Sequence, residues 1–390
     1  MQTVDVVIAG GGAVGSAIAY FLSRQSAFPG SLVVIEPDPT YSFAASARSA
    51  SSIRQQFSTP LNIALSAFGM EFLRAQGLGG SRELGDVGLH ESTYLLLASA
   101  AGVEALTRNI EVQRGCGVSA CLHHAGTLAS RYPWINASDL AAASDTRSGE
   151  GWFDGYALLR ALRLASERRG VRYLRDSVAS LVMSGADRVD GVRLGGGDTL
   201  RCRWLVNAAG THSRSLAAQA GIDLPVYPRK RTVFVFRSPA AIPNCPLVVD
   251  TTGLWFRPDG EQFICGPAPK LDPNVEPDDF EVDHQLFEEI AWPALAHRVP
   301  AFEAVRVSSA WVGHYDYNVF DQNAFIGPCE AVPNFLLACG FSGHGLQHAP
   351  GIGRALAELI TFGEYRTIDV AAFAYARYPR AQPLRELNVI

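Results

Sequence analysis

Three glycines near the start of the chain have the spacing of a dinucleotide-binding turn. Gly10, Gly12 and Gly15 form a GxGxxG pattern directly between a predicted strand, residues 5–9, and a predicted helix. Because glycine lacks a Cβ, the backbone amides at the start of that helix could closely approach a pyrophosphate. The competing interpretation is a tight turn without a ligand.

A carboxylate follows where the ribose of such a dinucleotide would lie. Glu36 ends the predicted strand 32–36, about 20 residues after Gly15, as this motif requires. Its oxygens could accept hydrogen bonds from the ribose hydroxyls, while Ala13 and Val14 would lie along the pyrophosphate. The pattern predicts a βαβ unit, but it does not separate NAD from FAD, because both carry the same adenosine diphosphate.

A second glycine-rich turn lies near the other end of the chain. It follows a predicted strand, 335–339, and leads to a helix predicted over 352–361, after Pro350. A helix N-terminus here could face a flavin ring and stabilise the negative charge that reduction creates, and a protonated His344 could balance the same charge. The alternative is a loop that only packs. The candidate contacts are Gly340, Phe341, Ser342, Gly343, His344, Gly345, Leu346 and Gln347.

The segment 45–54 is rich in small and hydroxyl-bearing residues and carries two arginines, Arg48 and Arg54. Small side chains would allow a cofactor to approach the backbone closely, although a solvated turn has the same composition. Its candidate cofactor contacts are Ala47, Arg48, Ser49, Ser51 and Ser52.

The elements around these motifs are of two kinds. Helix and strand patterns alternate in residues 1–80, 145–222 and 325–390, which predicts an interrupted α/β domain. Residues 223–324 contain short strands between Pro and Gly turns, then a helix predicted over 283–298 and a strand over 304–312. Together with 81–144, whose first part is the least readable stretch, they are assigned to a second domain. The predicted class is α/β with an α+β second domain.

Composition excludes several classes of function. The 390 residues are 48% hydrophobic and 18% charged, with a net charge of −5 and scattered arginines, so no nucleic-acid partner is expected. Seven cysteines form no CxxC pair, which argues against a metal site or a disulfide framework. Without a long apolar run or a leader pattern, we expect a cytoplasmic chain with no membrane-spanning segment.

Over essentially its whole length the chain resembles the D-amino acid oxidase and sarcosine oxidase family of FAD-dependent enzymes. The resemblance rests on the two glycine turns, the 45–54 segment and Asn207-Ala-Ala-Gly210. Four further strings, at 134–136, 150–154, 315–318 and 320–323, resemble the branch called FAD-dependent oxidoreductase domain-containing protein. The resemblance implies a glutathione-reductase-like FAD-binding Rossmann domain with an inserted antiparallel-sheet substrate domain.

The resemblance also implies roles for individual residues. Arg54 matches the arginine that pairs with the substrate carboxylate, a task suited to a planar guanidinium. Trp255, Tyr315, His344 and Gln347 would be walls or polar contacts of the substrate, with His314 a weaker candidate and Asp316 equally well structural. Arg48 would lie against the cofactor. The further implied cofactor contacts are Val178, Ala208, Gly210 and Gly313.

Three positions depart from the family pattern. Gly313 stands where some members bond FAD through cysteine, so we expect noncovalent FAD, with a histidine linkage left open. Gln347 replaces a lysine that binds the substrate carboxylate, whose place Lys230 or Arg231 could take. The oxygen-activating lysine falls near Ile264 or Gly266, neither of which carries charge, so a dehydrogenase is favoured over an efficient oxidase.

The predicted function is FAD-dependent oxidation of the carbon–nitrogen bond of a small amino acid. The expected substrates are N-substituted, sarcosine-like or N-carboxymethyl, and hydride transfer to the flavin would give an imine that hydrolyses. Oxygen or an electron carrier would be the acceptor. D-amino acid oxidation is an alternative, and alternatives of other classes are a non-catalytic flavoprotein that assists assembly of a respiratory complex and a nicotinamide-dependent dehydrogenase.

Overall fold

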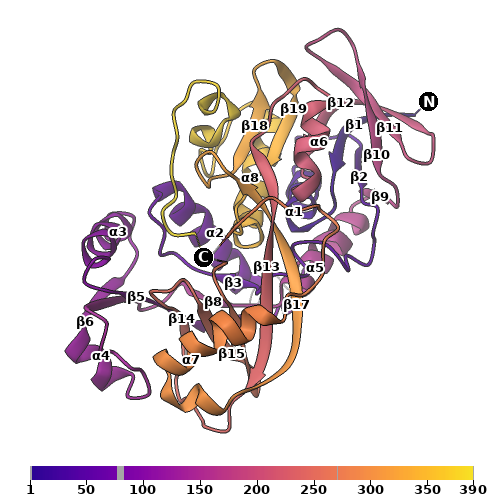
Figure 1. Ribbon diagram of the computed structural model, residues 1–390. Helices are drawn as coiled ribbons and strands as arrows, with labels where there is room; N and C mark the ends of the chain where they lie inside the picture. Colours follow the sequence, from indigo (N-terminus) through magenta and orange to yellow (C-terminus); the bar gives the residue numbers. More distant parts are fainter. Residues whose placement is uncertain (1, 77–82, 270, 390) are drawn as a thin grey trace.

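Two large β-sheets organise the residues described by the computed structural model, which are 2–76, 83–269 and 271–389 (Figure 1). In the first sheet the strand order is β10-β11-β12-β1-β2-β9, and β19 pairs with both β12 and β18. Its strands are β1 Gln2–Ala9, β2 Leu32–Ile35, β9 Arg172–Leu174, β10 Val178–Met183, β11 Val189–Leu194, β12 Thr199–Asn207, β18 Phe325–Cys329 and β19 Val332–Cys339.

The centre of the first sheet is parallel: β9, β2, β1, β12 and β19 run in one direction. Both faces of β1 are covered, because the successive side chains of Val6, Val7 and Ile8 are all buried. This explains why the sequence of the strand is a continuous apolar run. Helices α1 (Ala13–Ser23), α5 (Gly155–Arg168) and α8 (Gly345–Phe362) pack together beside it. The predicted strand, glycine turn, helix and strand at the start of the chain are confirmed.

Helices α1 and α8 touch through their backbones. A Cβ built on Gly353 of α8 would lie 2.6 Å from the main-chain carbon of Ala17 in α1. Only a glycine fits at this contact without a shift of one helix. The two helices therefore approach as closely as their backbones allow.

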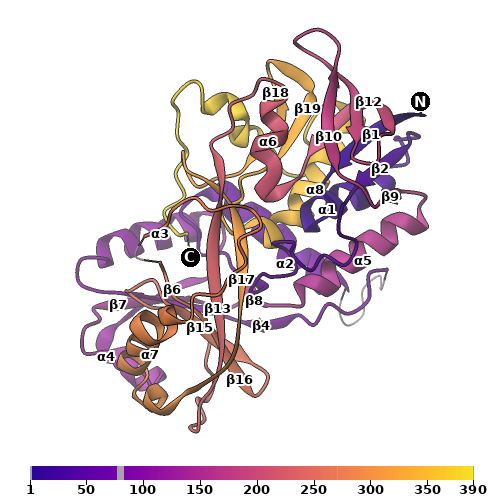
Figure 2. The ribbon, with the colours of Figure 1, turned by 45° about the vertical axis from the view of Figure 1, so that its right-hand side comes forward.

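The second sheet has the order β17-β13-β16-β15-β14-β5-β7-β6 and is antiparallel except between β14 and β5. Its longest strands, β13 and β17, pair along their length and run from this sheet towards the first (Figure 2). The strands are β5 Tyr94–Ala98, β6 Ala120–His124, β7 Ala142–Thr146, β13 Val226–Arg237, β14 Leu247–Val249, β15 Trp255–Asp259, β16 Gln262–Gly266 and β17 Arg306–Asn318.

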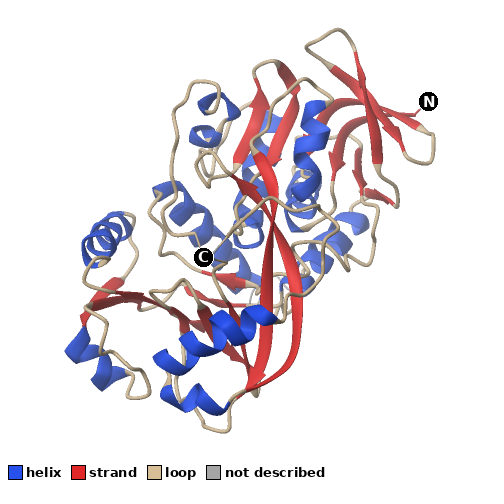
Figure 3. Cartoon of the chain, in the orientation of Figure 1, coloured by secondary structure: helices blue, strands red, loops and turns tan. Residues whose placement is uncertain are grey.

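Further helices flank the sheets (Figure 3). They are α2 Pro60–Gln76, α3 Val103–Gly115, α4 Ala125–Arg131, α6 Ser213–Ala218 and α7 Trp292–Arg298, with short 3₁₀ turns at Gly210–His212, Pro300–Ala304, Ala371–Phe373 and Tyr375–Arg377. A small sheet of β3 (Ser52–Ile53), β8 (Glu150–Trp152) and β4 (His90–Ser92) completes the described elements. No described helix is long and apolar enough to cross a lipid bilayer.

Three predicted elements were wrong in extent. The segment predicted as one helix over 283–298 is helical from residue 285 and includes a π-helical turn, Phe287–Ala291, that continues directly into α7. The strand predicted to end at residue 312 continues to Asn318, since it stays paired with β13. Helix α8 begins at Gly345, before Pro350, because its buried residues pack against α1 and α2 and outweigh one lost hydrogen bond.

The domain division predicted from the sequence stays a prediction. Its boundary between residues 144 and 145 would cut β7, which belongs to the second sheet. In the poorly readable stretch, which ends at His124, the structure describes β4 to β6 and α3.

Candidate functional site

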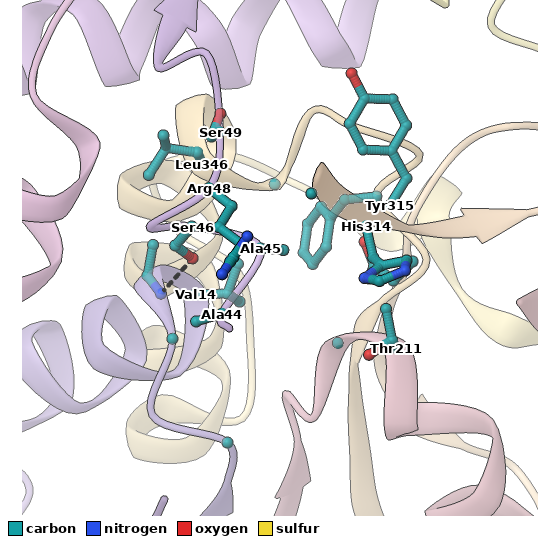
Figure 4. Close-up of a pocket in the computed structure, with 18 of the residues that line it drawn as sticks. Val14, Ala44, Ala45, Ser46, Arg48, Ser49, Thr211, His314, Tyr315 and Leu346 are labelled. Atoms are coloured by element: carbon teal, nitrogen blue, oxygen red, sulfur yellow. Dashed lines mark hydrogen bonds between the residues drawn. The ribbon is translucent and has the colours of Figure 1, made fainter. Parts of the chain in front are cut away.

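A cavity of about 680 Å³ runs from the first glycine turn to the second sheet. In the close-up of Figure 4, Val14, the Ala44–Ser49 segment and Leu346 lie on one side, and Thr211, His314 and Tyr315 on the other. The predicted site residues that line it are Gly10, Gly12, Ala13, Val14, Glu36, Arg48, Ser49, Ser51, Ser52, Arg54, Val178, Ala208, Gly210, Trp255, Gly313, Tyr315, Phe341, Gly343, His344, Gly345, Leu346 and Gln347.

At one end of the cavity the backbone fixes the acidic residue of the motif. The Gly11 amide donates to Glu36 Oε2 at 2.8 Å, and the Asp38 amide donates to Glu36 Oε1 at 3.0 Å. Gly10 has φ +99°, and a Cβ there would lie 2.3 Å from the Ala208 carbonyl oxygen. The turn therefore requires glycine and leaves the cavity side of the backbone open, which suits the adenosine diphosphate of a dinucleotide.

The 45–54 segment crosses the N-terminus of α1. The Ala13 amide donates to Ser46 Oγ at 3.0 Å, the bond drawn in Figure 4. Arg48 is held by the Ser42 and Val312 carbonyls, at 2.6 and 3.0 Å, and its guanidinium lies against the neighbouring rings of Phe43 and Phe280. A segment that sequence composition left ambiguous thus forms a wall of the cavity.

The second glycine turn brings the N-terminus of α8 to the same cavity. Gly343 has φ +93°, and a Cβ there would lie 2.6 Å from the ring of Tyr315, so the turn packs directly on that ring. Asp316 accepts a hydrogen bond from the Gly340 amide at 2.7 Å. Burial raises the pKa of Asp316 to about 6. Asp316 therefore shapes the turn, and the positive end of α8 faces the cavity.

Arg54 is the most informative cation of the site. It is 2% exposed, and its guanidinium lies over the Phe57 ring. Nη1 donates to the Gln56 carbonyl at 2.7 Å, and Nη2 donates to the Asn388 carbonyl. No described carboxylate forms an ion pair with it, although it lines the cavity.

His344 lies 3.2 Å from Nη2 of Arg54 and is neutral, because burial and the charge of Arg54 hold its pKa well below the ordinary value. A protonated His344 is disfavoured in this environment, and its part in balancing the flavin charge stays a prediction. Neutral His344 remains a wall residue of the cavity.

Gln347, which stands where family members have a lysine, contacts the main chain of Arg54. Its Oε1 accepts a hydrogen bond from the main-chain amide of Arg54 at 3.0 Å and another from Ser66 Oγ at 3.0 Å. This links the first residues of α8 to the strand-like segment that carries Arg54. Gln347 therefore positions the arginine main chain.

The other cations proposed for carboxylate binding are already paired. Arg231 lines the cavity but forms a bidentate pair with Asp272, at 2.6 and 2.9 Å. Lys230 pairs with Asp279 at 2.7 Å and does not line the cavity. Among the described lining residues, Arg54 is left as the buried cation whose charge no carboxylate neutralises by contact.

Four predicted cofactor contacts lie outside the cavity wall, namely Gly15, Ala47, Gly340 and Ser342. A Cβ on Gly15 would lie 2.0 Å from the Gly10 carbonyl oxygen, so this glycine allows α1 to pack on the turn. Gly340 supplies a φ of +77°, and Ser342 Oγ accepts from the Asn318 amide at 3.0 Å. Ala47 belongs to the turn before Arg48, where its amide bonds the Ala44 carbonyl. In the structure they shape the turns, and their contact with the cofactor stays a prediction.

Sequence reasoning missed several lining residues on the second sheet. Tyr94 and Leu247 occupy neighbouring positions of β5 and β14 and face the cavity with Trp255. Tyr94 begins an apolar run in the least readable stretch, so only alternation along β5 could have indicated it. Phe280 comes from a loop without any motif.

Comparisons with known proteins agree with this geometry. A family model described as FAD dependent oxidoreductase, DAO, matches residues 5–359. The chain is 39% identical to FAD-dependent oxidoreductase domain-containing protein 1 of Xenopus laevis, across 100% of this chain and 85% of that protein. It is 24% identical to mitochondrial dimethylglycine dehydrogenase of Rattus norvegicus, across 64% of this chain and 31% of that protein. The crystal structure of L-proline dehydrogenase from P. horikoshii has the same fold, with a TM-score of 0.86, 24% identity and coverage of 98% and 99%.

Proposed function

The chain belongs to the DAO family of FAD-dependent oxidoreductases, and on that premise we propose that it oxidises the carbon–nitrogen bond of a small, N-substituted amino acid with one carboxylate. Bound FAD would supply the hydride acceptor for the carbon beside the nitrogen, and the imine product would hydrolyse in water. The chain's own residues bind the substrate, orient it and exclude water. The observation that carries the proposal is the environment of Arg54.

A buried cation without a carboxylate partner favours an anionic ligand. Burial lowers the pKa of Arg54, but a guanidinium stays charged in proteins. Its neighbours within hydrogen-bonding distance are two main-chain carbonyls and the neutral ring of His344. A substrate carboxylate would supply a negative charge in contact with the guanidinium. The contact would contribute to substrate orientation, which as a whole can provide about 7–11 kcal/mol of the barrier.

The remaining wall suits an N-alkyl group. Tyr94, Leu247 and Trp255 present aromatic and aliphatic surface to the cavity that Arg54 lines. Low polarity favours the neutral form of the amine, which is the form able to lose a hydride. Because Arg231 is neutralised by Asp272, it would not serve a second carboxylate, as in N-carboxymethyl substrates. Arg48, the other lining arginine, already donates to the Ser42 and Val312 carbonyls.

The residues of the first sheet fit FAD. Glu36 and the first glycine turn would hold the adenosine diphosphate, and the N-terminus of α8 would face the ring. Attachment is proposed to be noncovalent, because Gly313 offers no thiol and a Cβ there would lie 2.9 Å from the Arg48 carbonyl oxygen. A linkage through a lining histidine, such as His314, is the alternative.

The electron acceptor is proposed to be a carrier in preference to oxygen. Gly266 lines the cavity and Ile264 does not, and no lysine is among the described lining residues. No ammonium group from the described part of the chain would therefore stabilise the charge that develops on oxygen. The cytoplasmic localisation predicted from the sequence stays a prediction.

Names of relatives support the substrate class. Dimethylglycine and L-proline, in the names of two similar proteins, are both amino acids whose nitrogen carries more than one carbon. D-amino acid oxidation remains the alternative within the family. A non-catalytic flavoprotein that assists assembly is the alternative of another class.

An anaerobic substrate panel tests the proposal. The FAD-loaded protein is mixed with N-methylglycine, N,N-dimethylglycine, L-proline, iminodiacetate and D-alanine, and flavin bleaching is followed by absorbance. We expect N-methylglycine or L-proline to bleach the flavin faster than D-alanine or iminodiacetate. N-methylglycinamide is the matched control, because it lacks the carboxylate charge. Preferential bleaching by D-alanine would select the first alternative, and no bleaching by any amine would favour the non-catalytic one.

A further inference from the structure

The last described residues of the chain return to the substrate end of the cavity. Figures 1 and 2 both show the yellow C-terminal chain passing from the side of the first sheet to the region of α2 and β3. There, residues 384–389 lie next to the segment that begins with Arg54. No sequence motif indicated any role for these residues.

This C-terminal segment contacts Arg54 directly. The Asn388 main-chain carbonyl accepts a hydrogen bond from Nη2 of Arg54. The Asn388 side chain donates to the Gln56 carbonyl at 3.1 Å, which is the same carbonyl that Nη1 of Arg54 contacts. Asn109 Nδ2 in turn donates to Asn388 Oδ1 at 3.2 Å. Asn388 therefore holds both the guanidinium and its neighbouring main chain.

Glu386 connects the C-terminal segment by hydrogen bonds to residues 58–62, which follow Arg54. Its Oε1 accepts from the Ser58 amide at 2.9 Å and the Ser58 hydroxyl at 2.8 Å, and its Oε2 accepts from the Thr59 amide and from Asn62 Nδ2, both at 3.0 Å. The Asn388 amide also donates to Oε1, at 2.9 Å. Glu386 is 2% exposed, so this carboxylate is buried among donors that need its charge.

Polar contacts hold the segment in place at both ends. The Leu384 amide donates to Asp321 Oδ2 at 3.0 Å, and the Glu386 amide donates to the Asp321 carbonyl at 3.1 Å. The Leu387 side chain, in contrast, is 68% exposed. Leu384 packs against the hydrophobic core, so changes at Glu386 should release mainly residues 386–389 and leave that contact in place.

We propose that residues 384–389 are a working part of the carboxylate-binding site, with Glu386 and Asn388 as positioning residues for Arg54. The Asn388 carbonyl occupies one N–H of the guanidinium and, together with the Gln56 carbonyl and the Phe57 ring, restricts the arginine to a single orientation towards the cavity. This inference rests on the proposed function. The C-terminal segment is far from Arg54 in sequence, since Asn388 lies 334 positions after it.

The test uses a ligand that cannot be oxidised. Methoxyacetate replaces the amine of N-methylglycine with an ether oxygen and keeps the carboxylate, and methoxyacetamide is its uncharged counterpart. Each is titrated into the FAD-loaded protein, and binding is read from the flavin absorption spectrum. Glu386→Gln keeps the shape of the side chain but loses its charge. Glu330→Gln is the control, because that glutamate pairs with Arg380 on the surface.

For Glu386→Gln we expect the dissociation constant of methoxyacetate to rise about tenfold, since hydrogen bonds to a charged group are weakened. Binding of methoxyacetamide and of FAD should not change. Hydrogen exchange at the Ser58 and Thr59 amides should quicken, which reports release of the segment directly. If Glu386→Gln does not fold, two other variants replace it: a chain that ends at Arg385, and Asn388→Ala. We expect Asn388→Ala to raise the dissociation constant less, because the main-chain carbonyl of residue 388 remains.

The outcomes separate the two proposals. If the unmodified protein binds neither probe, the proposed function fails and this inference fails with it. If it binds methoxyacetate but the variants bind it equally well, or lose both probes to the same extent, only the role of the segment is overturned. Selective loss of the charged probe supports it.

Discussion

The two ends of the cavity are built in different ways. At the nucleotide end, backbone amides and glycines close together in sequence do the positioning, as in the Gly11–Glu36 bond across 25 positions. At the substrate end, Arg54 is held by Gln347 and Asn388, which are 293 and 334 positions away. The first end depends on local conformation, and the second depends on buried polar contacts between distant segments.

This difference predicts different consequences of substitution. A change in the glycine turn should abolish cofactor binding whatever the substrate. A change around Arg54 should leave the flavin bound and alter the response to carboxylates. The following substitutions test this separation, from the largest expected effect to the smallest.

Gly10→Ala should weaken FAD binding roughly 100-fold or more, because a left-handed backbone and a contact with the Ala208 carbonyl both oppose a side chain there. The ratio of flavin absorbance to protein after desalting measures this. Gly126→Ala is the matched control, because a Cβ at Gly126 meets no atom within 4 Å. Full flavin content in Gly10→Ala would show that the turn is not the nucleotide site.

Arg54→Ala should leave the flavin content unchanged and slow flavin reduction by N-methylglycine about 10- to 100-fold, the effect of losing a charged hydrogen-bonding partner. Rapid-mixing absorbance under anaerobic conditions measures the rate. Arg366→Ala, which removes a half-exposed arginine paired with Glu364, is the control. An unchanged rate would show that Arg54 does not bind the carboxylate. Loss of flavin would show that the residues at the two ends of the cavity do not act separately on cofactor and substrate.

Asp316→Asn should change the pH dependence of stability. Burial raises the pKa of Asp316 from 3.8 to about 6, so the folded chain binds this proton more tightly than the unfolded chain. The resulting stabilisation is complete below pH 3.8 and is lost as the pH rises through about 6. The free energy of unfolding of the wild type, relative to that of the variant, should fall by roughly 1 kcal/mol between pH 5 and 7. Denaturant titrations at both pH values measure it, and a constant difference would contradict the assignment.

The nucleotide end of the cavity could be predicted from the sequence better than the substrate end. Gly10, Gly12, Gly15 and Glu36 act through local backbone geometry, which a short motif specifies, and the βαβ unit that carries them was predicted correctly. Gly15, predicted as a cofactor contact, lies outside the cavity wall. The start of α8 was not predicted, because Pro350 is a strong local helix breaker and only packing against α1 and α2 outweighs it.

The substrate end was only partly accessible from the sequence. Arg54 was found through family resemblance, whereas Glu386 and Asn388 have no spacing or residue pattern that connects them to it. Their importance arises from hydrogen bonds made after the chain has folded back. Tyr94 was hidden in an apolar strand for a similar reason, since burial alone does not distinguish a core residue from a cavity wall.

The backbone contact between Gly353 and Ala17 has a consequence for ligand length. Helix α1 presents its N-terminus to the pyrophosphate region and α8 presents its own to the ring region, so the contact between them fixes the distance separating two sources of positive potential. A ligand must match this distance between the two helix N-termini at both of its ends. A methyl group added at position 353, outside the cavity, would increase the distance and so weaken FAD binding without contacting FAD.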